Sequence, residues 1–110
     1  MLSIKKFRQI ALSFPGTEEQ PHFERASFRV KKKIFAILDE TKKKATLKFT
    51  AIDQSVFCLI DQSAIYPVPN KWGKQGWTIF ELAKVNSELM KGALNTAYKT
   101  IATASVKKSN

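Results

Sequence analysis

Residues 28–38 read FRVKKKIFAIL, and in them three lysines separate two apolar runs. Ahead of the lysines, apolar and polar residues alternate, with Ala26, Phe28 and Val30 set against Arg25, Ser27 and Arg29. A period of two is typical of a strand with one buried and one exposed face. The apolar run continues after the lysines from Ile34 to Leu38. The pattern therefore predicts two antiparallel strands joined by a basic turn, with one apolar face and one cationic face.

The register of this hairpin has two alternatives. A two-residue loop would pair Val30 with Lys33 and turn Phe35 inward beside Phe28, whereas a three-residue loop would pair Val30 with Ile34 and turn Phe35 outward. The second alternative would place an aromatic stacking surface among cations, as in proteins that bind single-stranded nucleic acids. The sequence leaves both alternatives open.

The remaining patterns extend the hairpin into a sheet with helices. Residues 45–50 alternate again after a second lysine triad at 42–44, which predicts the third strand of a meander. Helical spacing predicts helices over 3–14, over 53–62 from Ile52, Val56, Leu59 and Ile60, and from 86 onward. We expect segment 64–68 to be an edge strand or a loop, because Pro67 and the following Pro69 have no backbone N–H to donate to a sheet. Residues 77–82 are expected to form a last strand, and TEEQ at 17–20 a polar loop. This order predicts an α+β two-layer sandwich, an antiparallel sheet with helices packed on one face.

Length and composition limit the organisation and the partners. A chain of 110 residues suits one domain, here residues 1–104, with a frayed tail over 105–110. A net charge of +10 favours polyanionic partners, although surplus lysine can also serve solubility alone. The single cysteine, Cys58, excludes an internal disulfide, and the apolar stretch near the N-terminus is too short for a signal or a membrane span. We therefore expect a cytoplasmic monomer that does not associate with membranes.

Several short motifs occur together along nearly the whole chain. They are Pro15-Gly16, His22-Phe23, residues 28–38, Leu47-Lys48, GWTIFEL at 76–82, and Tyr98. Their order and spacing resemble the MmcQ/YjbR family, small bacterial proteins with a fold similar to the frataxin-like (CyaY-like) sandwich. The resemblance implies that fold, and it implies DNA binding through the analogy with a double-wing shape. The chain departs from the family pattern at Ala97, where a serine is usual, and at the lysine triad 31–33, where a glycine is common.

Metal and catalytic chemistry find little support in the sequence. One histidine and one cysteine cannot form a zinc site, and the acidic group of Glu18, Glu19 and Glu24 is more typical of a solvated loop than of a cation site. His22 stands beside Phe23, as a structural histidine often does. The chain has no glycine-rich phosphate loop and no nucleophile-elbow motif. We therefore expect no metal, no cofactor and no enzymatic activity.

The hypothesis favoured by the basic residues is a nucleic-acid-binding module, with DNA as the main candidate, that contacts phosphates through a basic sheet face. Its candidate residues are Arg25, Arg29, Lys31, Lys32, Lys33, Lys48, Lys71, Trp72 and Lys74. Trp72 lies between lysines on a loop and is either a stacking platform or a ring that folds back onto the domain. Trp77 starts a strand, and we expect it to be a core anchor packed under the last helix.

Two other hypotheses remain open. In the first, the basic surface and an exposed tryptophan bind an acidic protein. In the second, which the sequence supports less, a small ligand binds in a pocket around His22 and Trp77.

Overall fold

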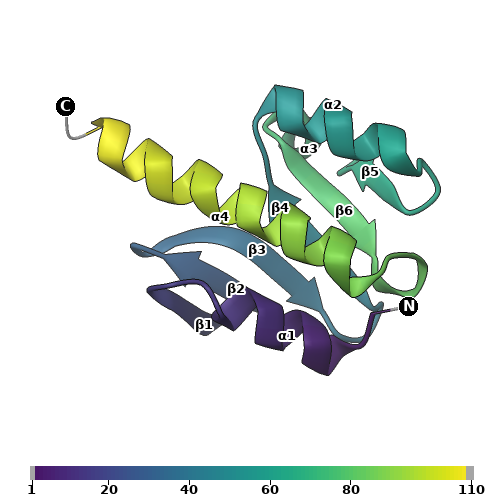
Figure 1. Cartoon of the computed structure of the whole chain (residues 1–110), viewed down its shortest axis with the longest axis horizontal. Coiled ribbons are helices and arrows are strands. Elements are labelled where there is room, and N and C mark those ends of the chain that lie inside the picture. The colour runs from purple at the N-terminus through teal and green to yellow at the C-terminus, as the bar shows by residue number, and fades with distance from the viewer. Residues whose placement is uncertain (1, 109–110) are drawn as a thin grey trace.

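The computed structural model describes the backbone of residues 2–108 and the side chains of residues 2–103. Its six strands form one antiparallel sheet in the order β1-β2-β3-β4-β6-β5 (Figure 1). The elements are α1 (Ile4–Leu12), β1 (Thr17–His22), β2 (Arg25–Val30), β3 (Lys33–Asp39), β4 (Lys44–Lys48), α2 (Ala51–Ile60), β5 (Ile65–Pro67), α3 (Lys71–Lys74), β6 (Trp77–Glu81), the 3-10 turn Leu82–Lys84, and α4 (Ser87–Lys108).

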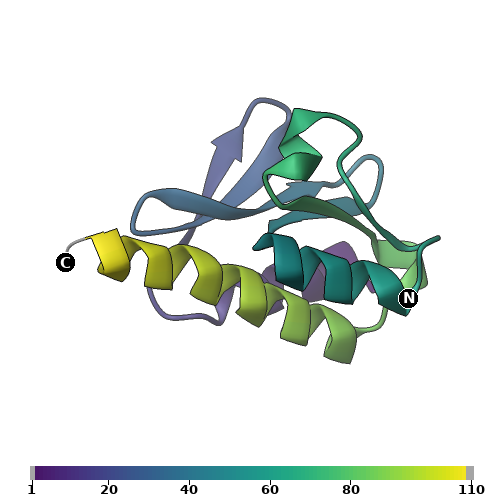
Figure 2. The same cartoon turned by 90° about the horizontal axis from the view of Figure 1, so that it is seen from above.

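Three helices cover one face of the sheet and leave the other face open. Figures 1 and 2 show α1, α2 and α4 on one side, while the single turn α3 stands on the opposite side near the start of β6. The core lies between the sheet and the three helices, and its largest side chains include Phe7, Phe28, Phe35, Phe49 and Phe80. The α+β sandwich predicted from the sequence is confirmed, with α3 as a small addition on the open face.

The β2–β3 hairpin has the two-residue loop. Val30 pairs with Lys33, and the turn residues Lys31 and Lys32 have φ angles of 52° and 68°. Two consecutive positive φ values are typical of the type I′ turn that fits the twist of a hairpin. Phe35 is therefore buried, with its ring 5.6 Å from that of Tyr98. No aromatic stacking surface arises from Phe35 on the open face.

The expectation of a loop at TEEQ was wrong, because residues 17–22 form the edge strand β1. Their side chains are exposed or half-buried, so they show no apolar alternation, yet their backbone pairs with β2 from Thr17↔Val30 to His22↔Arg25. The meander thus has four strands instead of three. The edge position expected for segment 64–68 is confirmed by β5.

The end of the chain was expected to fray over residues 105–110. The α4 backbone runs to Lys108, the side chains from residue 104 onward are not described, and residues 109 and 110 lie outside the described residues. The frayed tail stays a prediction.

Candidate functional site

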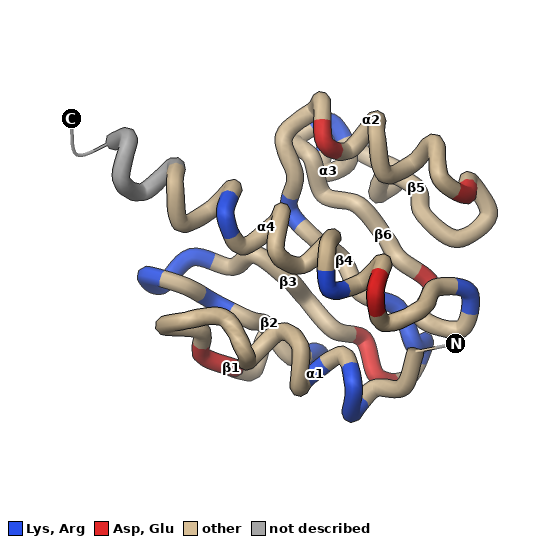
Figure 3. Tube along the Cα trace, in the orientation of Figure 1, with Lys and Arg blue, Asp and Glu red and all other residues tan. Residues whose placement is uncertain are grey.

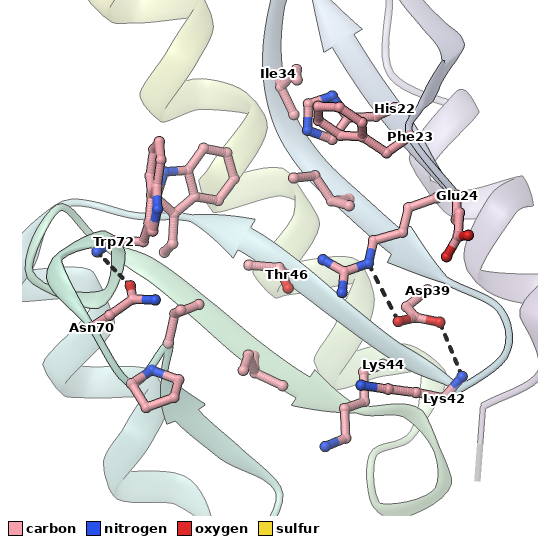
Figure 4. Close-up of a pocket in the computed structure, with 16 residues that line it drawn as sticks. His22, Phe23, Glu24, Ile34, Asp39, Lys42, Lys44, Thr46, Asn70 and Trp72 are labelled. Carbon is pink, nitrogen blue, oxygen red and sulfur yellow. Dashed lines mark hydrogen bonds and ion pairs between the residues drawn. The ribbon is translucent and has the colours of Figure 1, made fainter.

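The open face of the sheet carries a groove of about 1040 Å³ (Figure 4). Its floor comes from Ile34 and Ile37 of β3, Thr46 of β4 and Ile79 of β6. The register pairs Thr46 with both Ile37 and Ile79, and directly opposite side chains share a face, so these three lie on the open side. Ile34, three positions before Ile37, lies on the same side because the β2–β3 register shifts at Phe28/Arg29, where β3 has one residue more than β2. One wall is the β1–β2 turn, residues 22–25, and the other includes residues 68–70 and Trp72.

The position of Trp72 on its wall is fixed by local contacts. The Asn70 side chain caps α3 by accepting a hydrogen bond from the Trp72 backbone nitrogen at 2.8 Å. Gly73 lies so close to β5 that a Cβ there would be 2.0 Å from the Val68 carbonyl oxygen. The Trp72 residue is 51% exposed and lines the groove. Of the two alternatives for this ring, the structure shows the exposed one.

Phe23 stands on the opposite wall and was not among the predicted site residues. It is 93% exposed, it adopts a φ of 59°, and its ring is 5.0 Å from that of His22. The left-handed conformation costs an ordinary residue roughly 1–2 kcal/mol, and such strain often marks functional sites. Recognition of β1 would have placed Phe23 in a two-residue turn, because His22 pairs with Arg25. An apolar residue in such a turn is the signal that sequence reasoning missed.

The expectation that Trp77 packs in the core under α4 was wrong. Trp77 is half-buried on the open face, where it lines the groove and pairs with Lys48 of β4. The buried positions of β6 are taken by Thr78 and Phe80 instead. Alternation along a strand then requires Trp77 to point the other way. The Lys48 Nζ lies 5.7 Å from the centroid of the Trp77 ring, within the range of a cation–π contact.

The predicted cations on the open face are engaged with neighbouring groups. Arg25 lines the groove, and its Nε is 3.3 Å from an Asp39 carboxylate oxygen (Figure 4). Arg29 Nε donates to the Ser27 hydroxyl at 3.0 Å. Lys48 Nζ donates to the Gln75 carbonyl oxygen, and burial lowers the pKa of this ammonium.

The other predicted cations divide into two groups. Lys71 and Lys74 are exposed on α3, next to Trp72. Lys31, Lys32 and Lys33 are at the β2–β3 turn and do not line the groove; Lys31 instead borders a second hollow of about 590 Å³ beside Tyr98. Two lysines that the sequence hypothesis omitted, Lys42 and Lys44, do line the groove. The open face is thus apolar at its centre and cationic at its margins, rather than one continuous cationic band.

Metal-binding groups do not gather in the described part of the chain. No cluster of three or more His, Cys, Asp or Glu side chains occurs there. Of the predicted acidic group, Glu19 contacts Arg8 at 2.9 Å, and this hydrogen bond is the main cause of the raised pKa of Arg8. Cys58 is half-buried, and burial raises the pKa of its thiol. None of the described helices is both long and apolar enough to span a membrane.

Comparisons with known proteins agree with this architecture. No curated protein matches the chain. The crystal structure of the Deinococcus radiodurans protein DR2400, described as a DUF419 domain, superposes with a TM-score of 0.79 at 22% identity, covering 92% of this chain and 79% of that one. At this identity the likeness shows the fold. A family model described as YjbR matches residues 12–100, most of the chain. The chain therefore belongs to the YjbR family.

Proposed function

We propose that the chain is a non-enzymatic module that binds single-stranded nucleic acid in the groove of the open face. The observation that carries the proposal is the pair of exposed aromatic side chains, Phe23 and Trp72, on opposite walls of an apolar groove in a chain of net charge +10. Base stacking on aromatic rings and phosphate contacts with lysines are the two sources of affinity in proteins of this kind.

Unpaired bases suit the groove better than a duplex does. A base must expose its flat face to stack on Trp72 or Phe23, whereas the bases of a duplex cover each other's faces. Stacking contributes about 1–3 kcal/mol per base and depends little on which base is present. The floor is aliphatic apart from Thr46, so it has few groups that could read base edges. We therefore expect binding with little sequence preference.

Lysines at the margins are placed to contact phosphates. Lys71 and Lys74 flank Trp72, and Lys42 and Lys44 line the groove. Because Arg25 is paired with Asp39, it supplies less free charge than these lysines. Each phosphate that is neutralised releases counterions, which gives a slope of about −0.7 in the logarithm of affinity against the logarithm of salt concentration for single strands.

Fluorescence anisotropy with a labelled oligothymidine and a duplex of equal length tests the proposal. We expect the single strand to bind more tightly than the duplex, with affinity falling as salt is raised. Trp72→Ala should weaken single-strand binding by about 5- to 150-fold, the equivalent of 1–3 kcal/mol, while Trp72→Phe keeps most of it. Leu12→Ala, a change at an exposed leucine on α1, is the matched control and should leave affinity unchanged. No binding of single strands at low salt, or full affinity of Trp72→Ala, would overturn the proposal.

An acidic protein segment is the second candidate for the same groove. The observation in its favour is the aliphatic floor of Ile34, Ile37 and Ile79, which apolar side chains of a peptide would cover. Ile37→Thr separates the two candidates, since it should weaken peptide binding strongly and oligonucleotide binding little. An affinity that grows with oligonucleotide length favours the nucleic acid.

A further inference from the structure

The outer face of α2 is apolar and uncovered. Of the seven large apolar side chains that are exposed among the described residues, four belong to this helix. Ile52, Val56, Leu59 and Ile60 are between 54% and 76% exposed. Single exposed apolar residues are ordinary on protein surfaces, whereas a contiguous group of them marks an interaction site.

The exposed residues form a second stripe opposite the one that packs on the domain. Gln54, Phe57 and Cys58 are half-buried against the sheet, and the Phe57 ring stacks on Phe49 at 4.9 Å. The outer stripe has the spacing i, i+4, i+7 and i+8, which makes a ridge along the helix. Such ridges fit into the grooves of another helix. A helix that is apolar on both faces is normally covered on both.

The distribution of charged residues indicates which kind of partner could cover the outer face of α2. From residue 49 to residue 70 the chain contains no Lys or Arg, the longest such run in the sequence. Figure 3 shows α2 without blue along its length. The acidic residue Asp53 lies in the first turn of α2, and Asp61 is its C-cap. Two molecules that each carry a charge of +10 repel one another over most of their surfaces. A contact made by α2 itself therefore brings no Lys or Arg of this segment together, and the nearby Lys84 Nζ is held at the C-terminal end of the helix, where it donates to the Ser63 carbonyl oxygen.

We propose that the outer face of α2 is the interface of a homodimer, in which α2 of one copy packs against α2 of a second copy about a two-fold axis. Two-fold contacts use the same patch on both subunits, and an aliphatic ridge of this kind is complementary to itself. This arrangement replaces the monomer expected from the sequence. Because α2 lies on the helical side of the sheet, both grooves of the dimer would face away from the interface (Figure 2).

The dimer is expected to be weak. A stable interface buries about 800 Å² per partner, and one ten-residue helix supplies only part of that area. We expect half-association at tens of micromolar protein. The association needs no nucleic acid, so it can be tested independently of the function proposed for the groove.

Sedimentation velocity of the full chain without nucleic acid, from about 5 to 500 µM, tests the interface because the range brackets the expected midpoint. The wild type should shift from monomer to dimer across the range, and Leu59→Lys should stay monomeric throughout. Leu59 is 76% exposed, so this change is not expected to unfold the domain, which circular dichroism checks.

Leu12→Lys is the matched control, since it adds the same charge at an exposed leucine on α1. It should dimerise like the wild type. A wild type that remains monomeric at the highest concentration would overturn the proposal, whatever other partner covers α2. A dimer that persists in Leu59→Lys, or one that Leu12→Lys abolishes equally, would overturn it as well.

Discussion

The groove and the outer face of α2 both expose apolar side chains, but they differ in shape, side-chain type and charge. The groove is concave, has the rings of Phe23 and Trp72 on its walls, and carries lysines at its margins. The α2 face is convex and aliphatic, and the segment around it lacks Lys and Arg. Aromatic rings among cations suit flat, negatively charged ligands, whereas an aliphatic ridge without cations suits another helix. The kind of partner expected for an exposed apolar surface therefore depends on the shape of that surface and on the charges around it.

Gln54 connects the two regions through the domain. It lies on the inner face of α2, and its Nε2 donates to the Gly73 carbonyl oxygen at 2.9 Å and to the Thr78 hydroxyl at 3.1 Å. Gly73 belongs to α3, the turn that carries Trp72, and Thr78 belongs to β6 beneath the groove. We therefore expect a substitution that disturbs this contact to affect both the groove and α2.

Gly73→Ala should have the largest effect and should separate the two regions. The new Cβ would lie 2.0 Å from the Val68 carbonyl oxygen, a backbone atom that cannot rotate away, so α3 must shift. We expect a loss of about 3 kcal/mol in the free energy of unfolding, measured in urea, together with weaker oligonucleotide binding. Dimerisation should weaken less than oligonucleotide binding does, because the outer face of α2 keeps all of its side chains.

Gly92→Ala is the matched control for that substitution. Gly92 lies in α4, and its added Cβ would meet nothing within 4 Å. Alanine is the better helix former, so this variant should unfold at equal or slightly higher urea concentration. Unchanged stability of Gly73→Ala would show that the wall of the groove is not held at this contact.

Gln54→Met tests the connection itself, with a smaller expected effect. The thioether cannot donate, so the Gly73 carbonyl and the buried Thr78 hydroxyl lose a donor at nearly constant side-chain volume. We expect a destabilisation of about 1–2 kcal/mol, with oligonucleotide affinity and dimerisation both somewhat reduced. Ser55→Ala, at an exposed hydroxyl of the same helix, should change neither property. If only one of the two properties responds to Gln54→Met, the regions are not connected through this residue.

Lys32→Gly should stabilise the fold and have little effect on binding. Lys32 has a φ of 68°, which glycine adopts without the steric cost that lysine has. We expect a gain of about 1 kcal/mol in urea unfolding. Because the β2–β3 turn does not line the groove, affinity for a single strand should change less than about twofold, the effect of one distant charge. A tenfold loss of affinity would place this turn inside the nucleic-acid interface.

Sequence patterns predicted the elements that have a regular apolar side. Strands β2 and β4 alternate strictly enough to be recognised, β3 was recognised as an apolar run between them, and the edge position of β5 followed from Pro67 and Pro69. β1 was missed because an edge strand with polar side chains on both faces has no apolar period, although its backbone pairs fully with β2. That strand is formed by backbone hydrogen bonds, which the pattern of side chains in the sequence does not reveal.

The sites were harder to predict, because a periodic pattern of apolar residues predicts a helix or a strand without showing which of its sides packs against the core. Ile52, Val56, Leu59 and Ile60 correctly indicated a helix, but Gln54, Phe57 and Cys58 form the stripe that packs inward. Trp77 was assigned to the wrong face for the same reason, since the phase of β6 is set by Thr78 and Phe80 on the helical side. Charge and aromatic content singled out Arg25 and Trp72, which both line the groove, and their contact with a ligand stays a prediction.

Acid should destabilise both regions slightly, through one carboxylate in each. Beside the groove, the Tyr66 hydroxyl donates to Glu81 at 2.7 Å, and this hydrogen bond lowers the pKa of Glu81. At the end of α2, the Ser63 hydroxyl and backbone nitrogen both donate to Asp61, and these bonds lower the pKa of Asp61. A lowered pKa in the folded state means that the unfolded chain binds protons first as the pH falls.

The stability contributed by both carboxylates is therefore complete above about pH 5 and is lost as the pH falls toward 2, below their ordinary range. Urea midpoints measured between those values should decrease, and less steeply in Glu81→Gln and in Asp61→Asn, because each variant removes one titrating group. Both groups also interact with Lys84, whose Nζ lies 3.8 Å from a Glu81 carboxylate oxygen and donates to the Ser63 carbonyl oxygen beside Asp61. The two changes are therefore not expected to be strictly additive in the double variant. A double variant that titrates like one of the single variants would show that only one of the two carboxylates contributes to the acid dependence of stability.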